Sequence, residues 1–213
     1  MTDPSGTPAS RPFWEDGYRD VAAPSLFGPP SEEIQWLVPR LPRPARVLDL
    51  GCGDGRNALH LLAHGIDVTA VDVSESAVSK LTAQATPYAR RLTTKVQDIR
   101  LYRPAAPFDL IIAHGVLHLL PRLDWPTVIR RMQEHTTPSG YNAVTVFTDA
   151  LPPPHDLLPF AQGLFREGEL FDHYLHWRTE LRRSYVKEDQ HPGGERHRHP
   201  VNKIVARKPG PSR

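Results

Sequence analysis

Three alternate glycines follow a short apolar run in Val47-Leu48-Asp49-Leu50-Gly51-Cys52-Gly53-Asp54-Gly55, and a segment with a helical pattern comes next. Glycine has no Cβ and accepts a positive φ, so a ligand can lie directly against backbone N–H groups at the start of the helix. Such groups can bind the ribose or the amino-acid tail of an adenosyl nucleoside. A tight strand-to-helix turn without a ligand is the alternative.

Two carboxylates accompany this glycine turn. Asp49 comes just before it, and the next apolar run ends in Asp72. A carboxylate at the carboxyl end of a strand can accept hydrogen bonds from both hydroxyls of a ribose. The third glycine of the GxGxxG pattern is replaced by Arg56, which disfavours a nicotinamide dinucleotide as the ligand.

Basic side chains gather near the end of the chain, on a predicted hairpin: Arg183, His191, His197, Arg198 and His199. They can donate hydrogen bonds to an anion. Closely spaced imidazoles can instead bind a metal ion, and a solvated loop is the simplest alternative. We predict no metal site, because no cysteine or pair of carboxylates joins these histidines at ligand spacing.

The elements that must position these groups alternate between strand and helix. We predict strands at 46–50, 66–72, 92–96, 108–113 and 141–148, and helices at 31–41, 56–63, 74–85 and 124–135, with 136–140 ending the last of these helices. A loop, a short helix at 167–174 and two strand-like runs at 177–187 and 199–207 follow, with Gly193-Gly194 as their turn. This order predicts an α/β fold: a Rossmann-like, seven-stranded, mostly parallel doubly wound sheet with one antiparallel edge strand. Ligands bind such sheets at the carboxyl ends of the strands.

Composition places further limits on function. The chain has 213 residues with 26 Lys+Arg, 24 Asp+Glu and a single Cys, and its formal net charge is +2. We expect one domain over 11–208, flanked by flexible tails at 1–10 and 209–213. The balanced charge argues against nucleic acid or a membrane surface as partner and favours a small molecule. One cysteine and the lack of a membrane-length apolar run indicate a reducing compartment, the cytoplasm.

Four motifs resemble, in order, those of the class I S-adenosylmethionine-dependent methyltransferases: VLDLGCGDGRN, VTAVDVS, QDI and FDLIIAHGVLHLL. The resemblance implies that fold, S-adenosylmethionine as cofactor and S-adenosylhomocysteine as its product. It implies that the cofactor's methionine part lies beside Asp49, Gly51, Gly53 and Gly55 and above His114, its ribose beside Asp72 and Val73, and its adenine beside Asp98 and Ile99. Asp98 as a loop cap and Ile99 as a core residue are the alternatives.

Other segments resemble the tellurite-resistance methyltransferases of the TehB type: FWEDGYRD at 13–20, SGYNAVTVF at 139–147, FREGEL at 165–170 and GERHRHPVNKIVARK at 194–208. This likeness implies that Trp14 and Tyr18 fold over the cofactor, and that His197, Arg198 and Arg183 face the acceptor, a tellurium or selenium oxyanion. Trp14 as a simple anchor for the N-terminal segment is the alternative. His199-Pro200 departs from the family pattern.

Two classes of function remain. One is a methyltransferase acting on a small molecule, such as a tellurium or selenium oxyanion, a thiol or another metabolite. The other is a sensor or scaffold that binds S-adenosylmethionine without transferring its methyl group. Enzymes that methylate nucleic-acid bases are disfavoured, because Ala113-His114-Gly115-Val116 stands where an Asn/Asp-Pro-Pro-aromatic run or a nucleophilic cysteine is needed. His118 can face the acceptor or pack as a satisfied core histidine. We expect a monomer or a homodimer.

Overall fold

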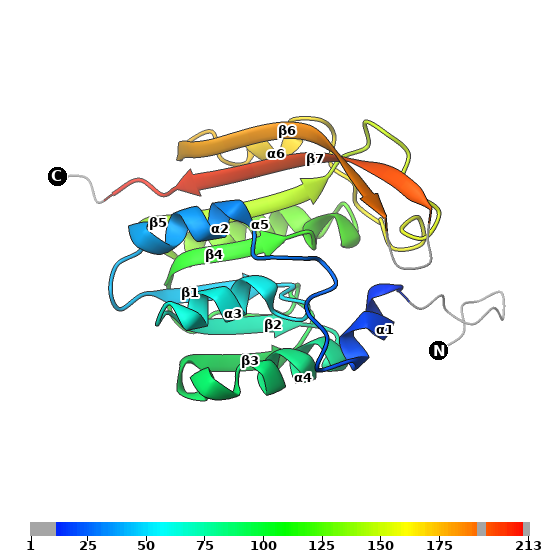
Figure 1. Ribbon diagram of the computed structural model, residues 1–213. Helices are drawn as coiled ribbons and strands as arrows, with labels where there is room; N and C mark the ends of the chain where they lie inside the picture. Colours follow the sequence, from blue (N-terminus) through cyan, green and yellow to red (C-terminus); the bar gives the residue numbers. More distant parts are fainter. Residues whose placement is uncertain (1–11, 191–194, 211–213) are drawn as a thin grey trace.

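The computed structural model describes residues 12–190 and 195–210, which form a sheet with helices on both faces (Figure 1). The sheet has seven strands in the order β3-β2-β1-β4-β5-β7-β6. Their bounds are β1 Arg46–Leu50, β2 Asp67–Asp72, β3 Leu92–Val96, β4 Phe108–His114, β5 Thr136–Phe147, β6 Arg178–Gln190 and β7 Arg196–Arg207. β7 runs antiparallel to both neighbours, so the one antiparallel strand lies just inside the edge strand β6.

The helices divide between the two faces of the sheet. They are α1 Trp14–Arg19, α2 Glu32–Leu37, α3 Arg56–Ala63, α4 Glu75–Gln84, α5 Trp125–Glu134 and α6 Glu169–Asp172, with short 3-10 helices η1 Val38–Arg40, η2 Thr86–Arg91 and η3 Leu117–Leu119. One core cluster joins α2, α3 and α4 to the sheet, and a second joins α5 and α6 to the opposite face. Because both faces are covered, β1 and β4 are almost wholly buried.

The chain enters the sheet in its middle and winds outward twice. β1, β2 and β3 follow one another toward one edge, and β4 then returns to pair with the other side of β1. The strand order therefore reverses between β1 and β4. A doubly wound sheet opens a crevice at such a switch point, outside the carboxyl ends of the strands.

Most of the predicted elements are confirmed, and several bounds match. β1, β3 and α3 have the predicted limits, and Ser74 caps α4 by accepting a hydrogen bond from the backbone N of Ala77 at 3.1 Å. The prediction for 136–140 was wrong. These residues belong to β5, where the pairing with β4 is irregular between Phe108 and Leu110, so the turn-forming residues make a bulge inside the strand.

Three further differences concern the ends of the chain and of its elements. The segment at 13–20 contains a helix, α1, that the sequence analysis did not predict. α2 ends at Leu37 and passes into η1, and α6 covers only part of 167–174. The predicted tail 1–10, the Gly193-Gly194 turn and residues 211–213 lie outside the described residues.

Candidate cofactor and acceptor site

The glycine loop connects β1 to α3 at the switch point. Gly51, Gly53 and Gly55 have φ values of 67°, 53° and 85°, in the left-handed region. A Cβ on Gly51 would lie 2.4 Å from Cγ2 of Val116, and a Cβ on Gly55 would lie 2.3 Å from Cδ1 of Leu81. A side chain at Gly51 or Gly55 would collide with these neighbours, so no side chain of the loop glycines covers its backbone at the start of α3.

Asp72 ends β2 beside this loop. Its Oδ2 accepts a hydrogen bond from the backbone N of Gly53 at 2.8 Å, and its Oδ1 accepts one from the backbone N of Ser74 at 2.9 Å. Burial raises the pKa of Asp72, although both hydrogen bonds act to lower it. The two backbone groups fix a carboxylate that can still accept from the two hydroxyls of a ribose.

Asp49 lies inside the sheet just before the glycine loop. The residue is only 2% exposed, and its Oδ2 has no hydrogen-bond partner. Burial raises the pKa of Asp49 to about 7, although the positive charge of Arg56 opposes this shift. A buried carboxylate oxygen without a partner is costly, which is why such atoms in folded proteins are nearly always paired. This atom is a candidate ligand contact.

The residues expected around the ribose and the adenine differ in exposure. Val73 is 73% exposed and presents an apolar surface beside Asp72. Asp98 is held by Arg100, whose Nε and Nη2 lie 2.9 and 2.6 Å from its Oδ2, and these hydrogen bonds lower the pKa of Asp98. Its Oδ1 accepts from the backbone N of Arg100 at 2.8 Å, as a loop cap does.

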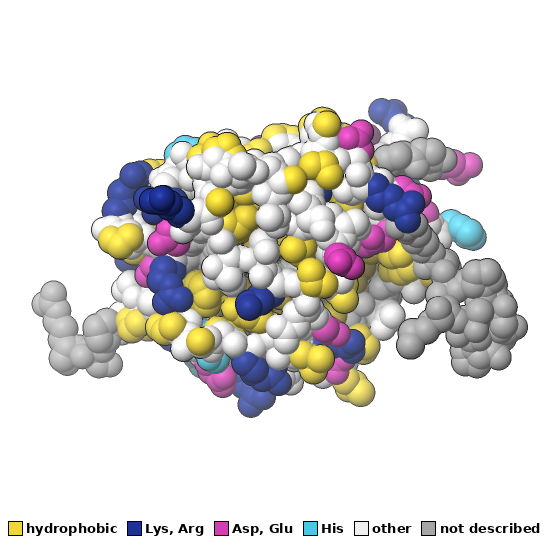
Figure 2. All heavy atoms as spheres, turned by 90° about the horizontal axis from the view of Figure 1, so that it is seen from below, with side chains coloured by type: hydrophobic (Ala, Val, Ile, Leu, Met, Phe, Trp, Pro, Cys, Tyr) yellow, Lys and Arg dark blue, Asp and Glu magenta, His cyan; other side chains and the backbone are white. Residues whose placement is uncertain are grey.

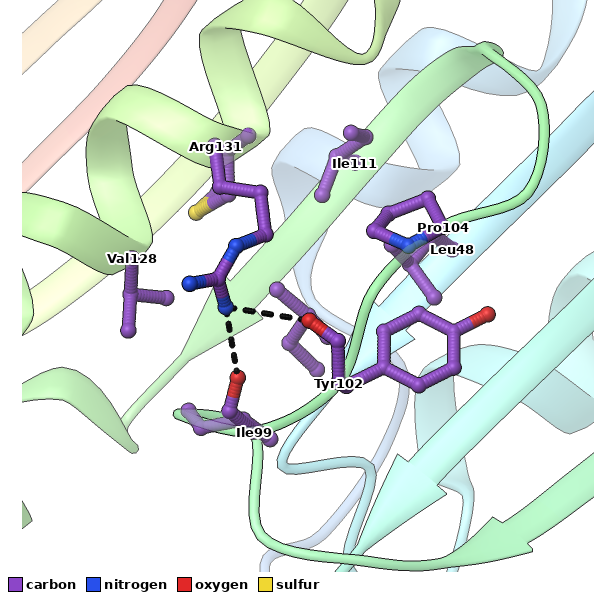
Figure 3. A pocket seen from close by; sticks show the side chains of 9 residues that line it. Leu48, Ile99, Tyr102, Pro104, Ile111, Val128 and Arg131 are labelled. Atoms are coloured by element: carbon purple, nitrogen blue, oxygen red, sulfur yellow. Dashed lines mark hydrogen bonds between the residues drawn. The ribbon is translucent and has the colours of Figure 1, made fainter.

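Ile99 packs into the core beneath α5. Only 5% of it is exposed, and it lines a small apolar cavity with Leu48, Tyr102 and Val128 (Figure 3). In the same view the guanidinium of Arg131 points to the backbone oxygens of Ile99 and Tyr102, at 3.4 and 3.0 Å. Little of the Ile99 side chain is left for a ligand.

The N-terminal helix α1 lies against the glycine loop. Tyr18 is buried, and its Oη would be 2.9 Å from a Cβ on Gly53. Burial, together with the negative charge of Asp72, raises the pKa of Tyr18 well beyond its usual range. Trp14 meets the ring of Phe160 edge to face, with centroids 5.3 Å apart, so α1 also contacts the long loop after β5.

A buried ion pair that the sequence analysis missed fastens this N-terminal segment. Lys80 of α4 lies 3.2 Å from Oδ2 of Asp54 in the glycine loop, and their side chains are 0% and 1% exposed. Lys80 also donates to the backbone oxygens of Gly17 and Pro24 at 3.2 and 3.3 Å, and Ser25 donates to Asp54 at 2.6 Å. The detectable signal was a lysine on the apolar stripe of a helix, between Ala77 and Leu81.

His114 ends β4 next to the glycine loop. Its Nδ1 lies 3.2 Å from Oγ of Ser31 and 3.2 Å from Oε1 of Glu33, both near the start of α2. The other carboxylate oxygen of Glu33 accepts from Nζ of Lys203 at 2.8 Å. Glu33 and Lys203 were also missed, because three elements far apart in the sequence bring them to His114.

Two histidines of the C-terminal hairpin contact each other. Nε2 of His197 lies 2.9 Å from Nε2 of His199, and Nδ1 of His197 lies 2.8 Å from the backbone oxygen of Glu195. A carbonyl oxygen only accepts, so Nδ1 of His197 carries a hydrogen, and in the neutral pair His199 donates through Nε2. His199 stacks on Phe147 with ring centroids 4.2 Å apart.

His118 stacks on the same phenylalanine at 4.3 Å. Its Nδ1 accepts a hydrogen bond from the backbone N of Phe147 at 3.2 Å, and burial lowers the pKa of His118 to about 3. It is the satisfied, neutral histidine that the sequence analysis gave as an alternative.

The two arginines expected on the acceptor side lie apart. Arg198 is exposed, and because it follows His197 directly in β7 its side chain leaves the opposite face of the strand. Arg183 pairs with Lys203 in register, whereas His197 pairs with Asp189 near the end of the hairpin. Nη1 of Arg183 lies 3.5 Å from Oε2 of Glu32, in a groove between α2 and β6. The structure therefore brings His197 to His199 and places Arg183 beside α2.

Charge on one face, possible metal groups and helix lengths can be described for the residues that the structure places. On the face seen from the β3 side, basic and acidic side chains are interspersed, and no continuous basic stripe crosses it (Figure 2). Within 12–190 and 195–210, no three His, Cys, Asp or Glu side chains are grouped so as to hold a metal ion. No described helix is both long and apolar enough to cross a bilayer.

Comparison with known proteins identifies relatives. The family model described as "Tellurite resistance protein TehB" matches residues 34–198. The "Probable S-adenosyl-L-methionine-dependent methyltransferase TehB" of Haemophilus influenzae (strain 10810) is 38% identical over 136 residues, covering 63% of this chain and 46% of that protein. A trans-aconitate 2-methyltransferase of Streptomyces avermitilis is 36% identical over 120 residues, covering 54% of this chain and 44% of that protein. The chain thus spans about half the length of these curated relatives.

A solved structure shows the same fold. The crystal structure of TehB from Haemophilus influenzae superposes with a TM-score of 0.75 at 30% identity, covering 84% of this chain and 62% of that one.

Proposed function

Because this chain belongs to the TehB family of tellurite-resistance proteins, we propose that it transfers a methyl group from S-adenosylmethionine to a small-molecule acceptor and releases S-adenosylhomocysteine. One observation carries this proposal. The bare glycine loop, the fixed carboxylate of Asp72 and the unpartnered Oδ2 of Asp49 lie together at the β1–β4 switch point. These are the donors and acceptors that the ribose and amino-acid ends of the cofactor need.

We assign the cofactor contacts from this arrangement together with the family resemblance. Gly51, Gly53 and Gly55 border the methionine part, and the ammonium of that part supplies a partner for Asp49. Asp72 accepts from the ribose hydroxyls. Val73 lies beside the ribose next to Asp72, the loop of Asp98 borders the adenine, and Ile99 supports that loop from the core. His114 lies under the methionine end, and Trp14 and Tyr18 cover the site from α1.

When bound, the cofactor supplies a methyl group on a positively charged sulfur. The chain holds the acceptor in line with that methyl group and excludes water from it. The Asp54–Lys80 ion pair fastens the segment after α1 across the glycine loop, which closes one side of the site. The rings of Trp14 and Tyr18 suit the neighbourhood of a sulfonium, because ring faces attract cations.

The acceptor we propose is a tellurium or selenium oxyanion held by His197. The family resemblance is what supports a role for Arg198, on the opposite face of β7, and for Arg183, beside α2. A carboxylate is a second candidate, because one relative is named for trans-aconitate. Both acceptors are anions that such donors bind.

The first experiment is calorimetric titration with S-adenosylmethionine and S-adenosylhomocysteine. Methyl-transfer assays on tellurite, selenite, trans-aconitate and 2-mercaptoethanol follow on the same sample. We expect binding of both nucleosides and transfer to at least one anion. Absence of binding overturns the proposal, and binding without any transfer favours a sensor or scaffold.

Variants of the hairpin test the acceptor side. His197→Ala and Arg198→Ala are expected to raise the KM of the anionic acceptor and to leave the Kd of S-adenosylhomocysteine unchanged. Arg196→Ala is the matched control, because Arg196 is also an exposed cation of β7. Equal kinetics in all three variants would remove His197 and Arg198 from the acceptor site.

A further inference from the structure

The imidazole of His114 is held through one ring nitrogen. Nδ1 lies 3.2 Å from both Oγ of Ser31 and Oε1 of Glu33, and Glu33 is 3% exposed. Burial alone would raise the pKa of Glu33, but the hydrogen bond with His114 and the charge of Lys203 lower it to about 2. Glu33 is therefore an ionised carboxylate inside the protein.

This contact assigns the tautomer of His114. An ionised carboxylate only accepts hydrogen bonds, so Nδ1 carries the hydrogen that faces Glu33. In the neutral ring, Nε2 then keeps its lone pair. The two ring nitrogens point in diverging directions, so Nε2 is turned away from Nδ1 and its partners on α2. The side chain of His114 is 19% exposed, although Ser31 and Glu33 enclose Nδ1.

The strand register places His114 beside the glycine loop. Leu50 of β1 pairs with Ala113 of β4, so the next residues, Gly51 and His114, are neighbours at the switch point. On its other side His114 pairs with Thr145 of β5, whose buried Oγ1 has no hydrogen-bond partner. Parallel strands in register send paired side chains to one face, so the imidazole of His114 and the hydroxyl of Thr145 lie on the same face of the sheet.

We propose that His114 is a general base oriented by Glu33, and that it allows the site to methylate acceptors that carry a proton on the attacking atom, in addition to anions that attack through a free lone pair. This inference rests on the methyl-transfer function proposed above. Thiols and selenols form this acceptor class. Glu33 is the positioning residue, in a carboxylate–histidine pair in which the carboxylate fixes the ring and stabilises the imidazolium that forms.

The proposed step moves one methyl group and one proton. Nε2 of His114 takes the proton from the acceptor while the electron pair of the acceptor forms a bond to the methyl carbon. The bond between sulfur and that carbon breaks, and its electron pair stays on sulfur. His114 is left as an imidazolium beside the carboxylate of Glu33 and returns its proton to water after the product leaves.

Four charged or titratable groups face His114 from the elements packed around it. Glu33 of α2 favours the imidazolium, whereas burial and the cations Arg56 of α3 and Lys203 of β7 disfavour it, and together they lower the pKa of His114. His118 of η3 is neutral. The base is therefore unprotonated at neutral pH, and the rate should fall only in acid.

The test compares His114→Asn and Glu33→Gln with the exposed control His64→Asn in methyl transfer to 2-mercaptoethanol, the one acceptor of the panel that carries a proton on its attacking atom. At pH 7 we expect kcat of His114→Asn to fall about 10²–10⁴-fold. The deficit should shrink as the pH rises through the pKa of the acceptor, because the acceptor then ionises without help. Glu33→Gln should lower kcat less and move the acid limb of kcat to lower pH.

A second readout does not depend on turnover. Nitrogen-15 NMR of labelled histidine should show His114 protonated on Nδ1 and bare on Nε2, with or without S-adenosylhomocysteine. Glu33→Gln should alter these signals, and Glu32→Gln, on the exposed side of the same helix, should not. A hydrogen on Nε2 in the native protein would overturn the assignment.

The two proposals fail in different ways. If the native enzyme transfers methyl groups and His114→Asn, still binding S-adenosylhomocysteine, matches it at every pH, the general base is excluded and the transferase function stands. If the native protein methylates tellurite or selenite but not 2-mercaptoethanol, the general base falls alone. If it transfers a methyl group to none of these acceptors, the proposed function falls, and the general base with it.

Discussion

The ammonium of Lys80 lies 3.2 Å from the carboxylate of Asp54, and both side chains are fully buried between α4 and the glycine loop. This pair joins the region that carries the candidate cofactor site to the N-terminal segment, because each partner also bonds to residues between Gly17 and Leu26. The ion pair therefore holds the N-terminal segment against the glycine loop, and each charge neutralises the other.

Removing one partner should destabilise the protein strongly. Lys80→Met leaves Asp54 charged and buried, and we expect a loss of about 3–5 kcal/mol in the free energy of unfolding. Urea titration measures this loss. The control is Arg91→Met, which breaks the exposed Arg91–Asp67 pair and should change stability by at most about 1 kcal/mol. Equal effects would mean that burial adds nothing to the Lys80 contact.

Gly51→Ala should impair folding and cofactor binding together. The new Cβ meets Val116 at 2.4 Å in addition to adopting a positive φ. Gly65 has a φ of 77°, and a Cβ added there would meet no atom within 4 Å, so Gly65→Ala reports backbone strain alone, about 1 kcal/mol. We expect calorimetry to show at least about tenfold weaker binding of S-adenosylmethionine for Gly51→Ala only. Native affinity in that variant would contradict a cofactor at the loop.

Asp49 should make the unliganded protein less stable as the pH rises. Its pKa is about 7 in the folded protein and about 3.8 ordinarily, so between these values only the folded state holds the proton. The free energy of unfolding therefore falls from about pH 4 to about pH 7. Asp49→Asn should lack this fall and exceed the native stability at pH 8, while binding the cofactor more weakly. If the free energies of unfolding of the native protein and of Asp49→Asn change in the same way with pH, the raised pKa of Asp49 is ruled out.

Glu33 should make the folded protein more stable as the pH rises from about 2 to about 4.5. Its folded pKa of about 2 lies below the ordinary 4.5, so its stabilising effect is complete above pH 4.5 and is lost as the pH falls toward 2. Glu33→Gln should be less stable than the native protein at pH 7 by about 2–3 kcal/mol, and the gap should narrow below pH 4. Denaturant titrations at several pH values measure it. Glu32→Gln, whose side chain is 85% exposed, is the control and should follow the native curve.

The sequence predicted the elements that local patterns define. β1 is a short run in which three of five residues are apolar, α3 begins directly after the glycine turn, and Ser74 is a helix cap, so each signal lies within a few residues. The start of β5 was missed because Pro138-Ser139-Gly140 has the composition of a turn, and only pairing with β4 keeps it in the strand. Tertiary pairing there overrides local preference.

The site was predictable in its glycines and acids but not in its ion pairs. The loop and Asp72 are marked by the strand-to-helix transition and by the end of a strand. Glu33 and Lys203 meet only because α2 packs across β7, and nothing in the local sequence links them. The prediction grouped Arg183 with His197 because both residues lie on the C-terminal hairpin. The strands of that hairpin are thirteen and twelve residues long, and Arg183 pairs with Lys203 whereas His197 pairs with Asp189. The two side chains therefore lie at different places along the hairpin.

The outer edge of β6 has a consequence for behaviour at high concentration. β6 is thirteen residues long and ends the sheet, so its outward N–H and C=O groups are unpaired by any other described strand. Such an edge can template the addition of a strand from another molecule and start aggregation. Here Arg182, Arg183, Lys187 and Glu188 occupy exposed positions along it. Any added strand would have to accommodate these charges, which keeps the long edge compatible with solubility.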